Sequence, residues 1–439
     1  MNFTGVRVCV AGTGVTGASA VKVLTALGAE VVTADRNDGS DEALPAGTEL
    51  VIASPGWPPT HPMLLAAAAA GIPVWGDVEL AWRLRPSGQQ GLGVTGTNGK
   101  TTTVQMLASM LSAAGRRAVA TGNVGFPVLD AVRAHPTYDV LAVEVSSFQL
   151  HRTVTVEFDA AAILNIAADH LDWHGSIEAY TADKALIWRG AGIHGIAVAN
   201  ADDPLVSRLA ARTAGSVGFT LHPPGPGQLG VHDGTLLDRT GVDGDGVVLA
   251  EVEDVTPAAP HNVANALAAA ALARSGGVDP AAVRAGLRGF SPGGHRIAHV
   301  ATVAGVDYVD DSKATNPHAA AASLRAFDRV VWVAGGLAKG ARFDEVVTAS
   351  AQRLRGVVLL GRDRALVAQA LERHAPQVPV VEVQGTDTGT MDDVVRAAAG
   401  LAHPGDTVLL APACASMDMF RDYGARGDAF AAAVRRLGT

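Results

Sequence analysis

Short apolar runs alternate along the chain with longer stretches whose apolar residues recur every three or four positions. In the first part, the runs Val6–Ala11, Glu30–Ala34 and Leu50–Ala53 have the length and the β-branched content of strands. The stretch Ala18–Leu27 has helical spacing, and Gly28 follows it as a helix stop. This strand–helix–strand order predicts parallel strands joined by crossover helices.

The same alternation continues to the C-terminus. The middle part predicts a strand, a glycine loop and a helix from Leu92 to about Ala114, strands at Val140–Val145 and Ala160–Ile166, helices at Ile177–Arg189 and Asn262–Arg274, and hairpin turns in residues 222–246. The last part predicts strands at Val306–Val309, Val330–Ala334, Val357–Leu360, Val380–Val383 and Thr407–Leu410 with helices between most of them, and therefore a parallel sheet covered by helices.

The segment Gly91–Thr103, GLGVTGTNGKTTT, has the form of a phosphate-binding loop between a strand and a helix. The usual pattern has a glycine where this chain has Val94, but such a loop binds phosphate through backbone N–H groups and does not need that residue. Lys100 is placed for the outer phosphates and Thr101 for Mg²⁺. The chain has neither the Asn-Lys-x-Asp of GTPases nor the His-Arg-Asp of protein kinases, which leaves a small-molecule kinase or an ATP-dependent ligase.

Candidate metal and phosphate partners follow the next two apolar runs. Glu144 ends a strand on the edge where phosphate loops open, so it is either a Mg²⁺ ligand or an ordinary cap. His170 and His174 are four residues apart, which raises the possibility of zinc, but the thiolate and Glu partners of common zinc motifs are missing. Mg²⁺ or substrate contacts are favoured for them. By pattern alone, Lys184 is a solvent-facing helix lysine.

Another glycine loop, Gly12–Gly17, is the first along the chain. It has the pattern Gly-x-Gly-x-x-Gly after a strand, and Asp35 ends the following strand. This is the dinucleotide-binding pattern, with the acid placed for a ribose hydroxyl, and by itself it predicts a nicotinamide-dependent oxidoreductase. Such an enzyme does not need a Mg-ATP loop. Two diphosphate sites, one for ATP and one for a nucleotide-linked substrate such as a UDP-sugar, account for both loops.

Two polar breaks, at Arg85–Gln90 and Phe290–Gly294, divide the chain. We therefore expect an α/β protein of three domains in series. These are an N-terminal Rossmann-like domain at residues 1–88, a central P-loop ATPase domain at residues 89–290, and a C-terminal Rossmann-like α/β domain at residues 291–439.

Composition narrows the class of protein. With 48% hydrophobic residues and a net charge of -9, the chain is globular and lacks the basic surface of a nucleic-acid-binding protein. Cys9 and Cys414 are the only cysteines, which predicts a reducing compartment. Because there is no signal-type leader and no run of about 18 apolar residues, we expect a cytoplasmic protein without membrane insertion.

Six motifs carry a resemblance to a known family. They are Gly-Thr-Asn-Gly-Lys-Thr (96–101), Glu-Val-Ser-Ser-Phe-Gln-Leu (144–150), Asn-Ile-x-x-Asp-His (165–170), His-Asn-x-x-Asn (261–265), Asp-Ser-Lys-Ala-Thr-Asn (311–316) and Pro-Ala-Cys-Ala-Ser (412–416). In this order the chain resembles the Mur ligases of peptidoglycan synthesis, and among them the branch that adds D-glutamate. The resemblance implies that ATP phosphorylates the carboxylate of UDP-N-acetylmuramoyl-L-alanine, that the amine of D-glutamate attacks the acyl phosphate, and that the enzyme is a monomer with two Mg²⁺ ions and a carbamylated lysine.

The resemblance also implies residue roles. ATP would contact Gly96, Thr97, Asn98, Gly99, Lys100, Thr101, Thr102, Asn262, Asn265, Arg296 and Asp311. The UDP-sugar would contact Thr16, Asp35, Arg36, Ser54, Asn123 and His170, and D-glutamate would contact Lys313, Thr315, Lys339, Ser416, Met417 and Tyr423. The metal ligands would be Thr101, Glu144, His170 and Lys184 as its carbamate, and the catalytic residues Lys100, His170 and Lys184.

Three alternatives remain at this point. A sister ligase would add another amino acid, and a folylpolyglutamate ligase would use the same phosphate loop but would not require the N-terminal glycine loop. An oxidoreductase of the nicotinamide-dependent class would bind NAD(H) at that first loop.

Overall fold

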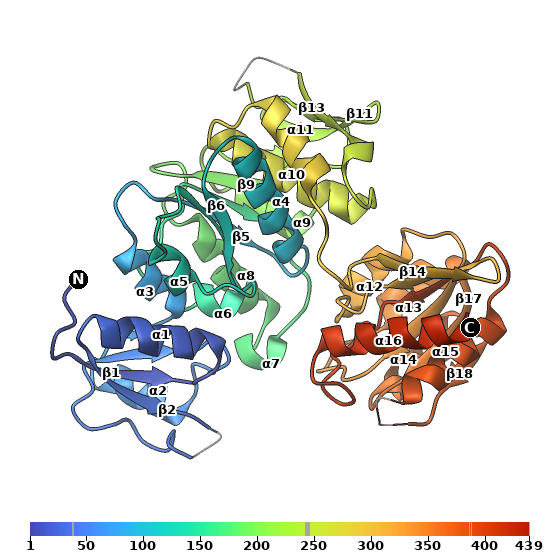
Figure 1. Ribbon diagram of the computed structural model, residues 1–439, viewed down its shortest axis with the longest axis horizontal. Helices are drawn as coiled ribbons and strands as arrows, with labels where there is room; N and C mark the ends of the chain where they lie inside the picture. Colours follow the sequence, from blue (N-terminus) through green and yellow to red (C-terminus); the bar gives the residue numbers. More distant parts are fainter. Residues whose placement is uncertain (37–38, 242–245, 386, 388, 439) are drawn as a thin grey trace. The chain divides into compact units, whose positions relative to one another are not determined.

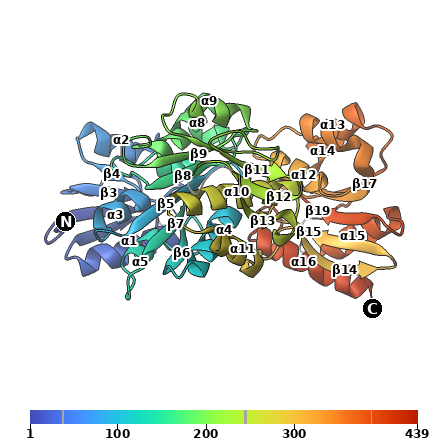
Figure 2. The same ribbon diagram turned by 90° about the horizontal axis from the view of Figure 1, so that it is seen from above.

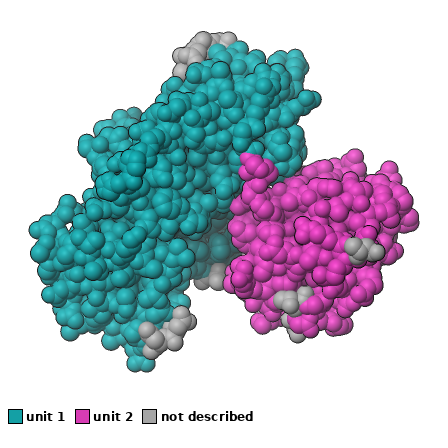
Figure 3. Space-filling model, in the orientation of Figure 1, with its two compact units in different colours: residues 1–290 teal, residues 291–439 magenta. Residues whose placement is uncertain are grey.

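The chain folds into two units, residues 1–290 and residues 291–439, which Figure 3 shows in different colours. The computed structural model describes residues 1–36, 39–241, 246–385, 387 and 389–438. Residues 242–245, which belong to the stretch predicted to form hairpin turns, lie outside the described residues.

The N-terminal sheet of the first unit is parallel, with strand order β2-β1-β3-β4. Its strands are β1 (Arg7–Ala11), β2 (Glu30–Ala34), β3 (Leu50–Ala53) and β4 (Val74–Trp75), and its helices are α1 (Val15–Ala26), α2 (Pro62–Ala69) and α3 (Asp77–Leu84). Val8 and Val10 face one apolar core while Cys9 and Ala11 face another, as the period of two in a strand requires.

The central sheet has the order β13-β12-β11-β10-β9-β8-β5-β7-β6, parallel from β6 to β11 and antiparallel at the β11–β12–β13 end. Its strands are β5 (Gln90–Thr95), β6 (Ala118–Gly122), β7 (Val140–Glu144), β8 (Ala160–Ile163), β9 (Ile196–Asn200), β10 (Val217–Phe219), β11 (Gln228–His232), β12 (Thr235–Asp238) and β13 (Val247–Glu251). Its helices are α4 (Lys100–Ala113), α5 (Val128–Val132), α6 (Ser147–Leu150), α7 (Leu171–His174), α8 (Ile177–Ala185), the 3₁₀ turn η1 (Leu186–Trp188), α9 (Pro204–Ala210), the 3₁₀ turn η2 (Val252–Asp254), α10 (Pro260–Ser275) and α11 (Pro280–Gly289).

Two cores sandwich the central sheet. On one face, α4, α10 and α11 pack together, and Figures 1 and 2 both show them side by side. On the other face, Leu141 and Val143 of β7 share a core with Val8, Val10 and residues of α1, α3 and α5. The N-terminal sheet and the central sheet are therefore joined by continuous apolar packing.

The second unit contains one sheet with the order β14-β15-β19-β16-β17-β18. Its strands are β14 (Ala298–Val303), β15 (Val306–Asp310), β16 (Val330–Gly335), β17 (Leu354–Leu360), β18 (Val380–Glu382) and β19 (Thr407–Leu410). The helices α12 (Pro317–Leu324), α13 (Asp344–Ser350) and α14 (Arg364–His374), with the turn η3 (Ala351–Arg353), cover one face; α15 (Thr390–Leu401) and α16 (Tyr423–Leu437) cover the other.

The predicted α/β fold is confirmed, with one correction. The alternation predicted a parallel sheet in the last part of the chain, whereas β14 pairs antiparallel with β15 at the sheet edge. The turn between them is short, and a tight hairpin reverses the chain direction. Among the described residues, no helix has the length and hydropathy that a membrane crossing requires.

Candidate active site

The glycine loop of residues 96–99, the second along the chain, connects β5 to α4. Gly99, which precedes α4, has a φ of 86°, a left-handed conformation that favours glycine. A Cβ atom on Gly99 would stand 2.3 Å from Oδ1 of Asn265 on α10. Asn265 in turn donates to Oδ1 of Asn262 over 3.4 Å. The structure therefore places Asn265 against the glycine loop, and Asn262, which was also predicted to contact ATP, lies next to Asn265.

Two lysine amines meet at one carbonyl of this loop. Nζ of Lys100 donates to the carbonyls of Gly96 and Thr97, both over 2.9 Å, and Nζ of Lys184 donates to the same Gly96 carbonyl over 2.9 Å. Lys184 is only 1% exposed, so it is not the solvent-facing lysine that its pattern alone indicated. Burial, and then the charge of Lys100, hold the pKa of Lys184 well below its usual range.

The sides of the loop are held by polar side chains from neighbouring elements. Oδ1 of Asn165 accepts the backbone N–H of Asn98 over 2.8 Å, and its Nδ2 donates to the Asn98 carbonyl over 3.1 Å. The hydroxyls of Thr97 and Tyr180 lie 3.1 Å apart. Asn165 and Tyr180 were not predicted as site residues, although Asn165 opens one of the recognised motifs.

Glu144 lies at the carboxyl end of β7, next to β5 in the sheet, and is 2% exposed. Its Oε1 accepts from Nδ2 of Asn123 over 3.1 Å. Its Oε2 is buried and has no hydrogen-bond partner among the described residues. A buried carboxylate oxygen without a donor is costly, and a hard cation is a suitable partner for it. The residues present therefore fit a Mg²⁺ ion beside the glycine loop.

Two other predicted metal ligands, His170 and Thr101, lie at or just before the start of a helix. His170 precedes α7 with a φ of 54°, and its side chain is 40% exposed. Thr101 is the second residue of α4. Across the described residues, no three His, Cys, Asp or Glu side chains come close enough to hold an ion by themselves. A site completed by the phosphates of a nucleotide is consistent with this arrangement, because Mg²⁺ is usually bound by few carboxylates plus phosphates and water.

The first glycine loop lines a pocket of about 320 Å³ in the N-terminal sheet region. Four predicted UDP-sugar residues, Thr16, Asp35, Arg36 and Ser54, are part of its wall. Oδ2 of Asp35 accepts the backbone N–H of Thr13 over 2.9 Å, so this carboxylate also holds the loop in shape. The other two predicted residues of that set, Asn123 and His170, are not among the pocket residues.

An aromatic residue that was not predicted closes this pocket. Trp57 lines it, is 4% exposed, and lies 5.0 Å below the guanidinium of Arg36. The indole thus fixes Arg36 by a cation–π contact at the wall. The only sequence signal for Trp57 was its place in the loop that follows β3.

In the second unit, the predicted D-glutamate residues follow three neighbouring strands. Lys313 and Thr315 come after β15, Lys339 after β16, and Ser416 and Met417 after β19. These strands are parallel and adjacent in the order β15-β19-β16, so their carboxyl ends lie on one edge of the sheet. A two-residue bridge between Leu337 and Ala415 ties the second and third loops together.

Two cations support these loops. Nζ of Lys313 lies 4.0 Å above the ring of Tyr423, the predicted aromatic residue. Arg426, which was not predicted, is 1% exposed and donates to Oγ of Ser312 over 2.9 Å and to the carbonyls of Ser312 and Cys414 over 2.8 and 3.0 Å. Arg426 therefore clamps the loop after β15 to the loop after β19. The sequence pattern around Arg426 does not distinguish it from an ordinary arginine on a helix.

Arg296 and Asp311, predicted to contact ATP, also belong to the second unit. Asp311 is 8% exposed and accepts a hydrogen bond from the hydroxyl of Ser323. Burial raises the pKa of Asp311 to about 6, and the charge of Arg296 opposes this shift.

Comparison with known proteins identifies the family. Residues 94–273 match the model of the Mur ligase middle domain, and residues 295–414 match the model of the Mur ligase, glutamate ligase domain. A UDP-N-acetylmuramoylalanine–D-glutamate ligase of Streptomyces avermitilis is 58% identical, covering 100% of this chain and 99% of the relative. The chain belongs to the Mur ligase family. The enzyme of the same name from Streptomyces coelicolor is 57% identical over 99% of each chain.

Solved structures support the Mur ligase fold over the whole length. The MurF ligase from Thermotoga maritima, solved in complex with ADP, has a TM-score of 0.60 and 18% identity, covering 99% of this chain and 96% of that one. The resemblance to the Mur ligases that the sequence motifs indicated is thereby confirmed, and so is the predicted fold.

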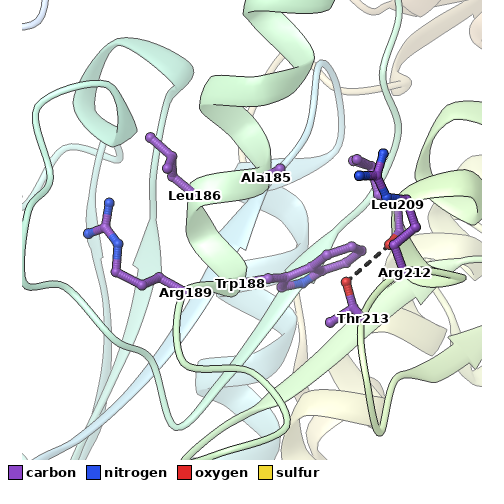
Figure 4. A pocket seen from close by; sticks show the side chains of 7 residues that line it. All are labelled: Ala185, Leu186, Trp188, Arg189, Leu209, Arg212 and Thr213. Carbon is purple, nitrogen blue, oxygen red and sulfur yellow. Dashed lines mark hydrogen bonds between the residues drawn. The ribbon is translucent and has the colours of Figure 1, made fainter.

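This Mur ligase has a further pocket, of about 350 Å³, lined by Ala185, Leu186, Trp188, Arg189, Leu209, Arg212 and Thr213 (Figure 4). The hydroxyl of Thr213 donates to the Leu209 carbonyl over 3.0 Å, and the indole N–H of Trp188 donates to the Ala161 carbonyl over 2.8 Å. Both groups are thus used within the fold. No predicted site residue lines this pocket.

Proposed function

We propose that this Mur ligase joins D-glutamate to UDP-N-acetylmuramoyl-L-alanine and converts ATP to ADP and phosphate. The names of the two Streptomyces relatives, which match the chain from end to end, support the choice of substrates. The observation that supports ATP-dependent chemistry concerns the glycine loop of residues 96–99 and the adjacent strand end. Oε2 of Glu144, which has no hydrogen-bond partner among the residues that the structure describes, lies at the end of the strand beside β5. The loop that follows β5 has two lysine amines on one carbonyl.

The glycine loop of residues 96–99 would receive the phosphates of ATP. When phosphate arrives, Lys100 can exchange its two carbonyl acceptors for phosphate oxygens, a charge-assisted contact of greater strength. Thr101 and Glu144 would hold Mg²⁺, which supplies positive charge that stabilises the phosphates during transfer. Asn262 and Asn265 would contact the nucleoside from α10.

The nucleotide end of the second substrate would occupy the pocket beside the first glycine loop. The N-terminus of α1 offers backbone N–H groups to its diphosphate, and Asp35, Arg36, Thr16 and Ser54 surround that position. Asn123 is hydrogen-bonded to Glu144, so we place the sugar end of the substrate there, together with His170. The muramoyl substrate would thus extend from the N-terminal sheet to the central one.

D-glutamate would be bound by the second unit. Lys313 and Lys339 would pair with its two carboxylates, and Thr315, Ser416, Met417 and the ring of Tyr423 would complete the pocket. Arg296 and Asp311 would meet ATP from the same unit. This assignment places the amine donor and the acyl acceptor on different units of the chain.

Lys184 would react with CO₂ to form a carbamate that helps to hold a second Mg²⁺ ion with His170. A lowered pKa favours the neutral amine, which is the nucleophile in that addition. The carbamate nitrogen keeps one N–H, which can still donate to the Gly96 carbonyl. Formation of the carbamate releases a proton and places a negative charge near Lys100.

In the proposed reaction, the free carboxylate of the alanine residue attacks the γ-phosphorus of ATP and ADP leaves. The resulting acyl phosphate has a good leaving group, which a carboxylate lacks. The neutral amine of D-glutamate attacks the acyl carbon and a tetrahedral intermediate forms. As the amide is made, inorganic phosphate departs and takes up the proton that the amine loses. Lys100 stabilises the negative charge that develops on the transferred group.

We further propose that the protein acts as a monomer in the cytoplasm, where ATP and UDP-linked precursors are available. Cys9 and Cys414 are both buried free thiols, consistent with a reducing compartment.

Phosphate release tests the assignment. With UDP-N-acetylmuramoyl-L-alanine and ATP, D-glutamate should support turnover, and L-glutamate, other amino acids and folate should not. Faster release with another amino acid would assign a sister ligase, and release with a folate acceptor would assign a folylpolyglutamate ligase. Titration with NAD(H) that saturates the first glycine loop would instead support the oxidoreductase alternative.

A further inference from the structure

His174, the last residue of α7, connects three elements of the first unit. Its side chain is 0% exposed. Nδ1 lies 2.9 Å from Oδ2 of Asp183 on α8, and Nε2 lies 2.9 Å from Oγ of Ser147 on α6. Both ring nitrogens are therefore used within the fold, so the pair His170 and His174 does not form the zinc site that their spacing raised.

The chemistry of the partners determines the direction of both bonds. A carboxylate only accepts hydrogen bonds, so Nδ1 carries a proton and donates to Asp183. In a neutral ring Nε2 is then an acceptor, and the hydroxyl of Ser147 donates to it. Desolvation lowers the pKa of His174, which favours the neutral ring.

Aromatic rings fix the orientation of this imidazole. Phe148 stacks nearly parallel to it, with ring centroids 5.4 Å apart and planes 8° apart. Tyr180 meets it edge-on at 5.1 Å, and the hydroxyl of Tyr180 in turn contacts Thr97 of the phosphate loop. The imidazole therefore has little freedom to rotate away from its two hydrogen-bond partners.

Each of the three connected elements has one predicted metal ligand on it or a few residues before it. His170 immediately precedes α7, Lys184 follows Asp183 on α8, and Glu144 lies three residues before Ser147. We infer that His174 is a positioning residue of this Mur ligase, whose two hydrogen bonds hold His170, Lys184 and Glu144 in register for the divalent cation. This inference rests on the proposed function, because that function supplies the cation.

The test compares variants that keep or remove each hydrogen bond. His174→Phe retains an aromatic ring but removes both bonds, and His174→Asn retains a donor at the position of Nδ1. His151→Phe is the matched control, since Nδ1 of His151 contacts the same Asp183 carboxylate at 3.0 Å but its side chain is 37% exposed. Ser147→Ala removes one bond with a smaller change of volume, and serves if His174→Phe does not fold.

The readouts are the affinity for Mn²⁺ in the presence of ADP, measured by electron paramagnetic resonance, together with kcat, the KM for the UDP-linked substrate and the unfolding midpoint. For His174→Phe we expect Mn²⁺ affinity and kcat to fall about 10- to 100-fold, the range found for groups that orient metal ligands. The KM for the UDP-linked substrate should stay unchanged, His174→Asn should recover part of the loss, and His151→Phe should behave as wild type.

Unchanged Mn²⁺ affinity in folded His174→Phe or Ser147→Ala would overturn the inference, as would losses that only track the unfolded fraction. Failure of the proposed function has a different signature. In that case the wild type would release no phosphate with D-glutamate, while the Mn²⁺ measurements would still compare the variants.

Discussion

The two glycine-rich loops of the first unit use the same backbone device in different electrostatic settings. Both follow a parallel strand and open a helix, and in each a glycine is required by a close neighbour. A Cβ atom on Gly17 would stand 1.7 Å from the Gly12 carbonyl, and one on Gly99 would stand 2.3 Å from Asn265. What differs is the charge around them.

The first loop is supported by an acid, because Asp35 accepts from the Thr13 backbone. The second is surrounded by Lys100 and Lys184 and lies near the carboxylate of Glu144, which has an unpartnered oxygen within the described part of the chain. Backbone N–H groups are sufficient to hold a diphosphate, whereas phosphoryl transfer also needs cations to stabilise moving charge. Under the proposed function, we therefore expect the first loop to bind the diphosphate of the UDP-linked substrate and the second loop to take part in phosphoryl transfer.

The largest expected effect comes from removing the loop lysine. Lys100→Ala should lower phosphate release by about 10³-fold, because a preorganised charge at the transferred group is lost. The affinity for the UDP-linked substrate, measured by calorimetry, should be retained. Lys22→Ala, a lysine whose side chain is 78% exposed in the same unit, is the control and should turn over normally. Equal loss of both properties in Lys100→Ala would contradict the division between the loops.

Substitutions at two glycines of the first loop should distinguish an effect on stability from an effect on substrate affinity. Gly17→Ala should destabilise the protein by about 3 kcal/mol in urea unfolding, because its methyl group collides with the Gly12 carbonyl. Gly14 has a φ of -61° and no described atom within 4 Å of an added Cβ, so Gly14→Ala should leave stability unchanged.

Gly14 also lines the pocket, and its methyl group would meet the diphosphate. The affinity of Gly14→Ala for the UDP-linked substrate should therefore fall roughly tenfold, about 1.4 kcal/mol. Wild-type affinity in Gly14→Ala would place the diphosphate elsewhere.

Glu144→Gln tests the cation site of the second loop. The amide keeps an acceptor for Asn123 but removes the buried charge, so metal-free protein should be at least as stable as wild type. The Mg²⁺ concentration needed for half-maximal phosphate release should rise by about tenfold or more. The exposed Glu178 on α8 provides the control Glu178→Gln. Loss of stability in EDTA would show that Glu144 serves the fold instead of the metal.

The last prediction concerns stability alone and involves α3 and α6, which join the sheets of the two loops. Nε2 of Gln149 donates to both carboxylate oxygens of Asp77, and burial raises the pKa of Asp77 to about 6. The unfolded chain releases this proton near pH 3.9. From about pH 4 to about pH 6 the folded state therefore holds more protons, and stability falls as pH rises, by at most about 1.4 kcal/mol per pH unit.

Asp77→Asn should remove this part of the pH dependence, which urea midpoints at several pH values would show. Asp311→Asn is the matched variant in the second unit, because burial raises the pKa of Asp311 to about 6 as well. An identical pH profile in wild type and Asp77→Asn would contradict a raised pKa, because it would mean that Asp77 has the same pKa in the folded and unfolded chain.

Much of the fold could be predicted from the chain. The strands β2, β3 and β19 have the predicted bounds, because they are short buried runs flanked by clear turn residues. The strand β14 was not predicted. It lies at the sheet edge, where one side of the strand is unpaired and its residues are only partly buried, so its apolar pattern is weak. The helices α2 and α3 were also missed.

The candidate site, like the fold, could be predicted only in part. The glycine loops and the residues they contain were visible as local patterns, and the motifs indicated the Mur ligases. The ligand roles implied for Lys313, Lys339 and Tyr423 stay predictions. Arg426 and Trp57 were missed. Arg426 connects two loops and Trp57 lines a pocket, and neither role produces a local sequence pattern when the contacted residues are distant in the chain.

The sequence by itself determined where the chain makes a tight turn into a helix, because a glycine's conformational freedom and an apolar run act over a few residues. Tertiary structure alone decided that Lys184 reaches the Gly96 carbonyl, that Asn265 packs on Gly99, and that His174 joins three elements. Those contacts depend on strand order and helix packing, which bring together residues far apart in the chain and desolvate them. Burial then changes what a lysine or a histidine can do chemically, and no local pattern of residues records it.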